Sequence, residues 1–310
     1  MDKLLGTNRL AASLRLTVKR IMLNYIANNF RQSLPTAQSS IMLSSKFLPG
    51  LVSVLAWLTL RTVGLAQELP SGLHRIEHAA IRGATIYRGE RRLYVVPVEL
   101  TEGGSMIIPR MFSSIRSIGW SNSEKTVPIE LQPEPETWLI RWKERPAEAS
   151  WLWIEFDDEP IALTELQPSR ASGDGSLFMP ASKAITTGEK LRFEPQSHKN
   201  TVGYWTTASD TASWRLNIDR AGEFNIEILQ GCGAGQGGSR GSIKLMNDQA
   251  EIASIEFDVL ETGHFQNFQW RHLGQLKVAE PGVYTLIISP ITIKKAALMD
   301  VRAVHLVRLP

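Results

Sequence analysis

Short runs of alternating apolar and polar residues recur along the chain, and they constrain its fold more than any other feature. In "TWLIRWKE" (137–144), Trp138, Ile140 and Trp142 share one face, and "ASWRLNID" (212–219) alternates in the same way. Period-two alternation over runs of this length predicts half-buried β-strands. No segment of ten or more residues after the first 66 carries a clean helical period. We therefore expect an all-β protein.

Turn residues divide these runs into two strand-rich halves. Gly, Pro, Asn and Asp lie between the runs, where their backbone preferences favour turns. A stretch without periodicity, "SRASGDGSLFMPAS", separates the halves and is rich in Ser and Gly, which is typical of a linker. The pattern predicts two antiparallel β-sandwich domains. We place them at 67–168 and 184–310, joined by a linker at 169–183.

The first 66 residues read as a leader that contains a signal peptide. Lys46 precedes the apolar run "FLPGLVSVLAWLTL" (47–60), and small side chains follow at Gly64 and Ala66. This order predicts a secretory signal peptide that is cut after Ala66. The run is short for a transmembrane helix, which needs about 20 residues. Met42 would make a conventional start for such a peptide, so translation is expected to start there rather than at Met1. The alternative is that residues 1–41 form a cytoplasmic extension before a signal anchor.

Removal of residues 1–66 changes the charge balance of the chain. The full chain has 34 Lys and Arg and 31 Asp and Glu, and the leader holds eight of the bases and one of the acids, so the mature net charge becomes −4. Phosphate-backbone binding needs Lys and Arg clustered on one face, and no such run remains after the cut. We therefore expect no nucleic-acid partner.

A glycine-rich stretch, "LQGCGAGQGGSRGS" (229–242), resembles a dinucleotide fingerprint through Gly233, Gly235 and Gly238. Such a fingerprint works because its glycines open a helix whose N-terminal amides meet a pyrophosphate. Here the next residues, "SRGSIKLMND", alternate like a strand. We therefore expect a strand connector and no nucleotide. Cys232, the single cysteine, is expected to be a small buried residue at a strand end.

An ordered series of strands and loops in the second half suggests a family. The series runs from "ASWRLNIDRAGEFNIEI" through the Gly-rich loop, "GSIKLMND" and "ETGHFQNFQWRHLGQLKV" to "EPGVYTLIISP" and "KKAALMDVRAVHLVRL". Residues 184–310 thereby resemble the galactose-binding-like β-sandwich modules appended to secreted bacterial α-L-fucosidases and sulfatases. Residues 74–166 resemble, more faintly, the C-terminal β-domain of α-L-fucosidases, through "GATIYRGERRLYVVPV" and "WLIRW".

The resemblance and the residue types together suggest sites. Sugar rings are bound by aromatic faces and by a few polar side chains that fix hydroxyl groups. Tyr204 and Trp205 stand in a polar, turn-like stretch, which makes Trp205 a candidate stacking platform, although core packing is the alternative for every Trp. The candidate carbohydrate-binding residues are Tyr204, Trp205, Gln236, Arg240, His264 and Asn267, the last four placed in two connectors. The resemblance also implies a structural calcium at Glu194 and Asp300.

These expectations lead to a functional hypothesis. No catalytic motif occurs in the chain, and a catalytic barrel of about 250 residues would leave no room for the strands. We expect a secreted, periplasmic or cell-surface bacterial protein that is not an enzyme and that binds a glycan or polysaccharide. A separate carbohydrate-active enzyme or surface protein would be its protein partner. The alternatives are an adhesion protein that uses the sandwiches for protein contacts, and a fucosidase- or sulfatase-related hydrolase.

Overall fold

The computed structural model describes residues 68–123 and 127–310. The predicted leader, its apolar run and the cleavage position after Ala66 lie outside the described residues. The described part contains strands and two short 3₁₀ turns, η1 (Leu163–Glu165) and η2 (Ala181–Lys183), and it contains no α-helix. The all-β prediction is confirmed. None of the helices in the described part is long and apolar enough to cross a membrane.

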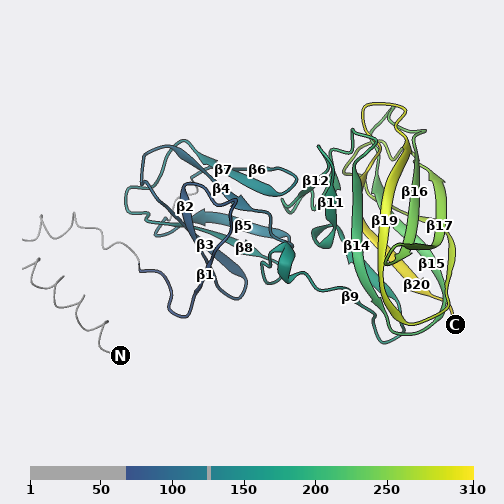
Figure 1. Cartoon of the computed structure of the whole chain (residues 1–310). Coiled ribbons are helices and arrows are strands. Elements are labelled where there is room, and N and C mark those ends of the chain that lie inside the picture. The colour runs from purple at the N-terminus through teal and green to yellow at the C-terminus, as the bar shows by residue number, and fades with distance from the viewer. Residues whose placement is uncertain (1–67, 124–126) are drawn as a thin grey trace, which may run out of the picture. The chain divides into compact units, whose positions relative to one another are not determined.

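The first half folds into two antiparallel sheets (Figure 1). One has the strand order β1-β2-β3-β8-β5, and the other has the order β4-β7-β6. Buried residues alternate along these strands, as the period-two pattern predicts. The strands are β1 (His74–Ile76), β2 (Ala84–Arg88), β3 (Arg92–Pro97), β4 (Gly104–Pro109), β5 (Ile115–Trp120), β6 (Ile129–Pro133), β7 (Thr137–Trp142) and β8 (Leu152–Phe156).

The second half is a β-sandwich of two sheets, drawn in green to yellow in Figure 1. The first sheet has the order β12-β13-β20-β15-β18 with β10 added to β20, and the second has the order β11-β14-β19-β16-β17 with β9 added to β14. Its strands are β9 (Ser169–Arg170), β10 (Leu177–Pro180), β11 (Ile185–Thr187), β12 (Arg192–Glu194), β13 (Thr201–Gly203), β14 (Thr211–Ile218), β15 (Gly222–Gly231), β16 (Arg240–Asn247), β17 (Ala250–Asp258), β18 (Gln269–Val278), β19 (Gly282–Thr292) and β20 (Asp300–Arg308).

The segment predicted as a linker, 169–183, belongs to the second sandwich. β9 pairs with β14 in parallel, and β10 pairs with β20 in antiparallel register from Leu177↔Leu306 to Pro180↔Ala303. The linker prediction is wrong. β9 and β10 have only two and four residues, too few to display an alternation, and the residues between them are rich in Ser and Gly. The sandwich therefore begins at 169. Its strand β10 includes the exposed aromatic residue Phe178.

The core of the second sandwich follows the sequence pattern. Trp214, Leu216 and Ile218 on β14 are buried, as are Phe224 and Ile226 on β15. The side chains between them point away from the core and are half-buried or exposed. Because successive side chains of a strand point to opposite faces, each sheet has one face in the core and one outer face.

The Gly-rich stretch connects two strands, as expected. β15 ends at Gly231 and β16 begins at Arg240. No helix follows the glycines, so no helix N-terminus is available there for a phosphate group. The expectation that this loop connects two strands is confirmed.

Candidate functional site

Two connectors of the second sandwich converge. They are 232–239, between β15 and β16, and 259–268, between β17 and β18. The amide of Ala234 donates to the carbonyl of Gly263 at 3.1 Å, and the amide of Gly235 donates to the Glu261 carboxylate at 2.8 Å. The connectors thus form one loop cluster that is held mostly by its own backbone.

The aromatic side chains of this loop cluster, Phe265 and Phe268, are half-buried. A Cβ at Gly233 would clash with the ring of Phe265, and a Cβ at Gly231 would clash with the carbonyl of Phe265. The ring of Phe268 is covered by the guanidinium of Arg302, 3.8 Å from the ring centroid. The contacts between the two connectors are therefore made by polar groups and backbone.

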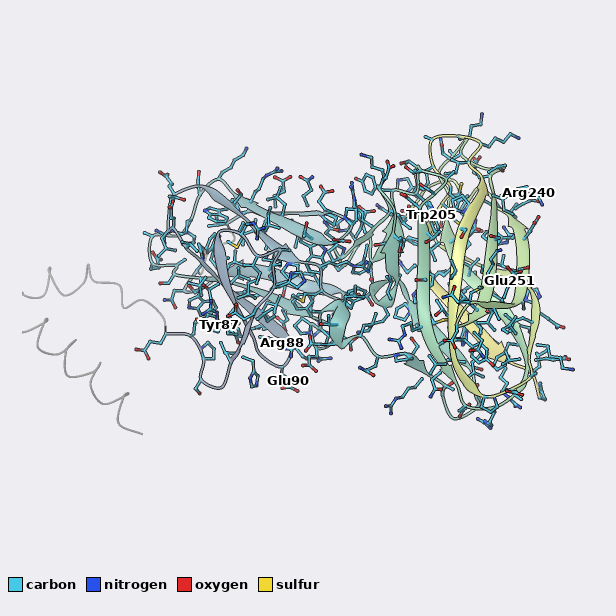
Figure 2. All side chains as sticks on the ribbon, viewed as in Figure 1. Tyr87, Arg88, Glu90, Trp205, Arg240 and Glu251 are labelled. Carbon is cyan, nitrogen blue, oxygen red and sulfur yellow. The ribbon has the colours of Figure 1, made fainter. Side chains whose placement is uncertain are left out.

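Trp205 is not a stacking platform. It is fully buried, with 0% of its surface exposed, and its Nε1 donates to the carbonyl of Asp210 at 2.9 Å (Figure 2). The prediction for Trp205 is wrong because the polar residues around it in sequence form the turns that enclose it. Tyr204 is exposed, but the guanidinium of Arg192 lies 3.5 Å from its ring centroid and covers one face.

The other predicted residues occupy different positions around the loop cluster. Arg240 is not in a connector: it is the first residue of β16 and pairs with Glu256 and Asp258 (Figure 2). Gln236 lies in the first connector, where its side-chain oxygen accepts from the amide of Ala296 at 3.1 Å.

In the second connector, His264 and Asn267 are both exposed. The Nδ1 of His264 accepts from the amide of Gln266 at 3.1 Å, and the Nδ2 of Asn267 donates to the carbonyl of Thr262 at 2.6 Å. Gln236, His264 and Asn267 thus lie in the same loop cluster. Their hydrogen bonds to backbone groups stabilise the conformation of the loops.

Cys232 lies under the loop cluster and is fully buried. Its amide donates to the Thr262 hydroxyl at 2.8 Å, and its carbonyl accepts from the Thr262 amide. Burial, with the nearby carboxylates of Glu261 and Asp300, raises the pKa of the Cys232 thiol. It has the structural role expected from the sequence.

The thiol of Cys232 is expected to be inert in the folded protein. The thiolate is the reactive form, and burial together with the raised pKa keeps it scarce near neutral pH. Titration with a chromogenic disulfide at pH 7.5 should show slow reaction in buffer and rapid, stoichiometric reaction in 6 M guanidinium chloride. Rapid labelling in buffer would show that the loop cluster opens.

A cluster of aromatic side chains that the sequence did not predict lies on the outer face of the first sheet of the second sandwich. The strand register aligns four side chains in one row, because Phe178 pairs with His305, His305 with Glu227, and Glu227 with His272. Residues directly opposite each other in antiparallel strands lie on the same face. Trp270 is two residues before His272 on β18 and therefore shares that face.

Three rings of this cluster contact one another, and Phe178 and Trp270 remain open to solvent while His305 is half-buried. Phe178 is 54% exposed and Trp270 46% exposed, although both are large apolar residues. Their ring centroids are 6.5 Å apart, and His305 lies 5.9 Å from Phe178 and 6.2 Å from Trp270. We call Phe178, Trp270 and His305 the aromatic platform. Solvated aromatic rings that meet in this way provide a ready apolar contact surface for a ligand.

The polar groups beside the platform in this row are the carboxylate of Glu227 and the imidazole of His272. Glu227 stands in register between His305 and His272. Neither this row, which starts at Phe178, nor the neighbouring pair of Leu229 and Trp270 contains Lys or Arg. These groups can accept and donate hydrogen bonds to hydroxyl groups. A carboxylate at the centre of the row disfavours an anionic ligand at this position.

The two residues predicted to hold calcium come close together. Glu194 and Asp300 are both buried, and a Cβ at Gly203 would lie 3.0 Å from the Oε2 of Glu194 and 2.8 Å from the Oδ1 of Asp300. Burial, and then the charge of Glu194, raise the pKa of Asp300 to about 8, and the charge of Lys199 opposes this rise.

The donor set around this pair is small for a metal. In the described part of the chain, no three or more His, Cys, Asp and Glu side chains gather in a group that could hold a metal ion. Calcium prefers six to eight oxygen ligands. The side chain of Lys199 already bonds to the Oε1 of Glu194. The calcium prediction stays a prediction, and the residues present do not fit it well.

Comparison with family models found no match. Among curated proteins, none matched this sequence either. Solved structures gave matches at low similarity. An α-L-fucosidase from Vibrio sp. strain EJY3 matches with a TM-score of 0.31 and 11% identity, over 72% of this chain and 39% of that protein.

Two smaller proteins also match. The C-terminal CBM6 of LamC from Zobellia galactanivorans has a TM-score of 0.35 and 19% identity, over 43% of this chain and 99% of the module. A family 35 carbohydrate-binding module from Clostridium thermocellum has a TM-score of 0.34 and 12% identity, over 43% and 98%. The sequence-based resemblance to β-sandwich modules of carbohydrate-active proteins agrees with these matches, which are an α-L-fucosidase and two carbohydrate-binding modules. The chain spans about two fifths of the fucosidase, and TM-scores this low carry no argument about function.

Proposed function

We propose that this protein binds a neutral carbohydrate chain on the aromatic platform of its second sandwich. The observation that carries the proposal is the mutually contacting set of the exposed Phe178 and Trp270 and the half-buried His305, aligned by strand register. Aromatic faces pack against the C–H groups of a pyranose ring, and neighbouring polar groups bind its hydroxyls. Glu227 and His272 supply such groups in the same row.

The absence of Lys and Arg from these register positions supports a neutral ligand over an anionic one. Uronates and sulfated sugars carry charges that a guanidinium or ammonium group would bind. Here the central charged group is Glu227, which would repel them. The platform therefore favours neutral hexose chains.

Binding assays on the purified chain test this proposal. Pull-down with insoluble neutral polysaccharides and a glycan array that includes neutral, uronate and sulfated chains should give binding to neutral glycans. Binding to no glycan would overturn the proposal, and preference for anionic glycans would overturn the ligand class.

We also propose that the protein acts without catalysis and is exported. The lack of catalytic motifs and the order of basic, apolar and small residues before Ala66 support this proposal. Assays with chromogenic glycosides and aryl sulfates should give no turnover. Amino-terminal sequencing of protein recovered outside the cytoplasm should begin at Gln67. Turnover would favour the hydrolase alternative, and retention of the intact leader in the cytoplasm would exclude export.

A further inference from the structure

A buried pair of carboxylates in the second sandwich lies beside a lysine. Glu194 ends β12, Asp300 begins β20, and both are buried. Gly203 on β13 lies between them, and a Cβ there would press on both carboxylates. Buried carboxylates are stable only when they are paired with a cation, hydrogen-bonded or protonated.

A lysine supplies that charge from a rigid turn. The side chain of Lys199 bonds to the Oε1 of Glu194, whose side chain is 6% exposed. Two backbone bonds close the turn, because the amides of Lys199 and Asn200 both donate to the carbonyl of Gln196, at 2.9 and 2.8 Å. The turn therefore places the backbone of Lys199 close to the carboxylates.

An arginine holds the same turn from the other side. Arg302 on β20 donates to the carbonyls of His198 and Lys199, at 3.2 and 2.6 Å. Its guanidinium also stacks on Phe268, 3.8 Å from the ring centroid. Because these bonds hold the backbone of the turn, the Lys199 Cα is fixed close to Glu194, and only the lysine side chain has to be ordered to form the ion pair.

We propose that the ammonium group of Lys199 takes the place of a metal ion beside Glu194 and Asp300, so that the second sandwich is stable without calcium. A calcium ion beside Glu194 would compete with the lysine for the carboxylate and would be repelled by it. The two carboxylates alone are also far short of the oxygens that calcium prefers. The lysine thus makes the sandwich insensitive to the calcium concentration around it.

Thermal unfolding with and without metal tests the proposal. The Tm of the purified chain should change by less than about 1 °C between 5 mM EDTA and 5 mM CaCl₂, and calorimetric titration with CaCl₂ should give no heat of binding. A fall in Tm in EDTA that calcium reverses would overturn the proposal, as would saturable calcium binding.

Substitution of the lysine gives a second test. Lys199→Met keeps the aliphatic stem and removes the charge, so we expect a Tm loss of about 5 °C or more. The control Lys190→Met removes an exposed lysine and should leave the Tm nearly unchanged. A loss no larger than that of the control would contradict the proposal.

The double variant Lys199→Met/Glu194→Gln covers the case in which the single variant does not fold. It removes both charges of the pair, so it should recover most of the loss, because the penalty of Lys199→Met comes from the unpaired carboxylate. A double variant as unstable as Lys199→Met would show that the lysine acts through packing, and this would overturn the proposal.

Discussion

Replacement of Asp210 by Ala is expected to lower the free energy of unfolding by about 4 kcal/mol and the Tm by about 10 °C. Asp210 is fully buried before β14, and its carboxylate accepts three backbone bonds, from Glu189 at 2.7 Å, Lys190 at 3.0 Å and Leu191 at 2.8 Å. Each bond to a charged acceptor contributes about 1.5–3 kcal/mol, and its loss leaves an amide without its partner.

The backbone around Asp210 makes this loss hard to repair. Gly188 has a φ of +120°, and a Cβ there would lie 2.1 Å from the Oδ1 of Asp210, so the loop is shaped to fit the carboxylate. Denaturant unfolding of Asp210→Ala and of the control Asp219→Ala, which removes an exposed carboxylate paired with Arg220, measures the effect. Equal stability of the two variants would show that the three bonds contribute little.

Replacement of Trp270 by Ala is expected to weaken glycan binding by about 10- to 100-fold, which corresponds to about 1.4–2.8 kcal/mol. Trp270 is the largest ring of the aromatic platform, and it is 46% exposed, so the folded state loses little packing when it is removed. Phe178→Ala should weaken binding by a smaller factor because the ring is smaller. Isothermal calorimetry with a glycan identified on the array measures both.

Two variants separate the platform from other surfaces. Val283→Ala removes an exposed apolar side chain from β19 in the other sheet, and it should bind with the affinity of the unaltered protein. His264→Ala changes the loop cluster and should also leave affinity unchanged. Loss of binding in His264→Ala together with full binding in Trp270→Ala would move the site to the loop cluster.

The fold could be predicted where single strands display their own pattern. The alternation around Trp214 and Phe224 identified β14 and β15, and the alternating residues after Gly238 identified β16. β9 and β10 were missed because each is too short to show a period. Their place in the sheets depends on pairing with β14 and β20, which lie far away in sequence.

The site could be predicted only in part, for a related reason. Phe178, Trp270 and His305 come from β10, β18 and β20, and only the strand register brings them together. β10 is too short to show an alternation, and Trp270 is an even number of residues from the buried Leu276, so strict alternation would place both on one face. Only the register shift between Ile226 and Glu227, opposite Gly274, turns Trp270 outward. Trp205 was misjudged because burial here depends on the turn ending at Asp210 and on Leu298, whose amide donates to the carbonyl of Trp205.

Chemical-shift mapping of the tryptophan side chains tests the binding account most directly. In a ¹⁵N-labelled sample titrated with a neutral oligosaccharide that the array identifies, the indole N–H signal of Trp270 should shift and saturate with the calorimetric Kd. The indole signals of the buried Trp205 and Trp214 should not move. Saturable binding that leaves the Trp270 signal in place would contradict the account.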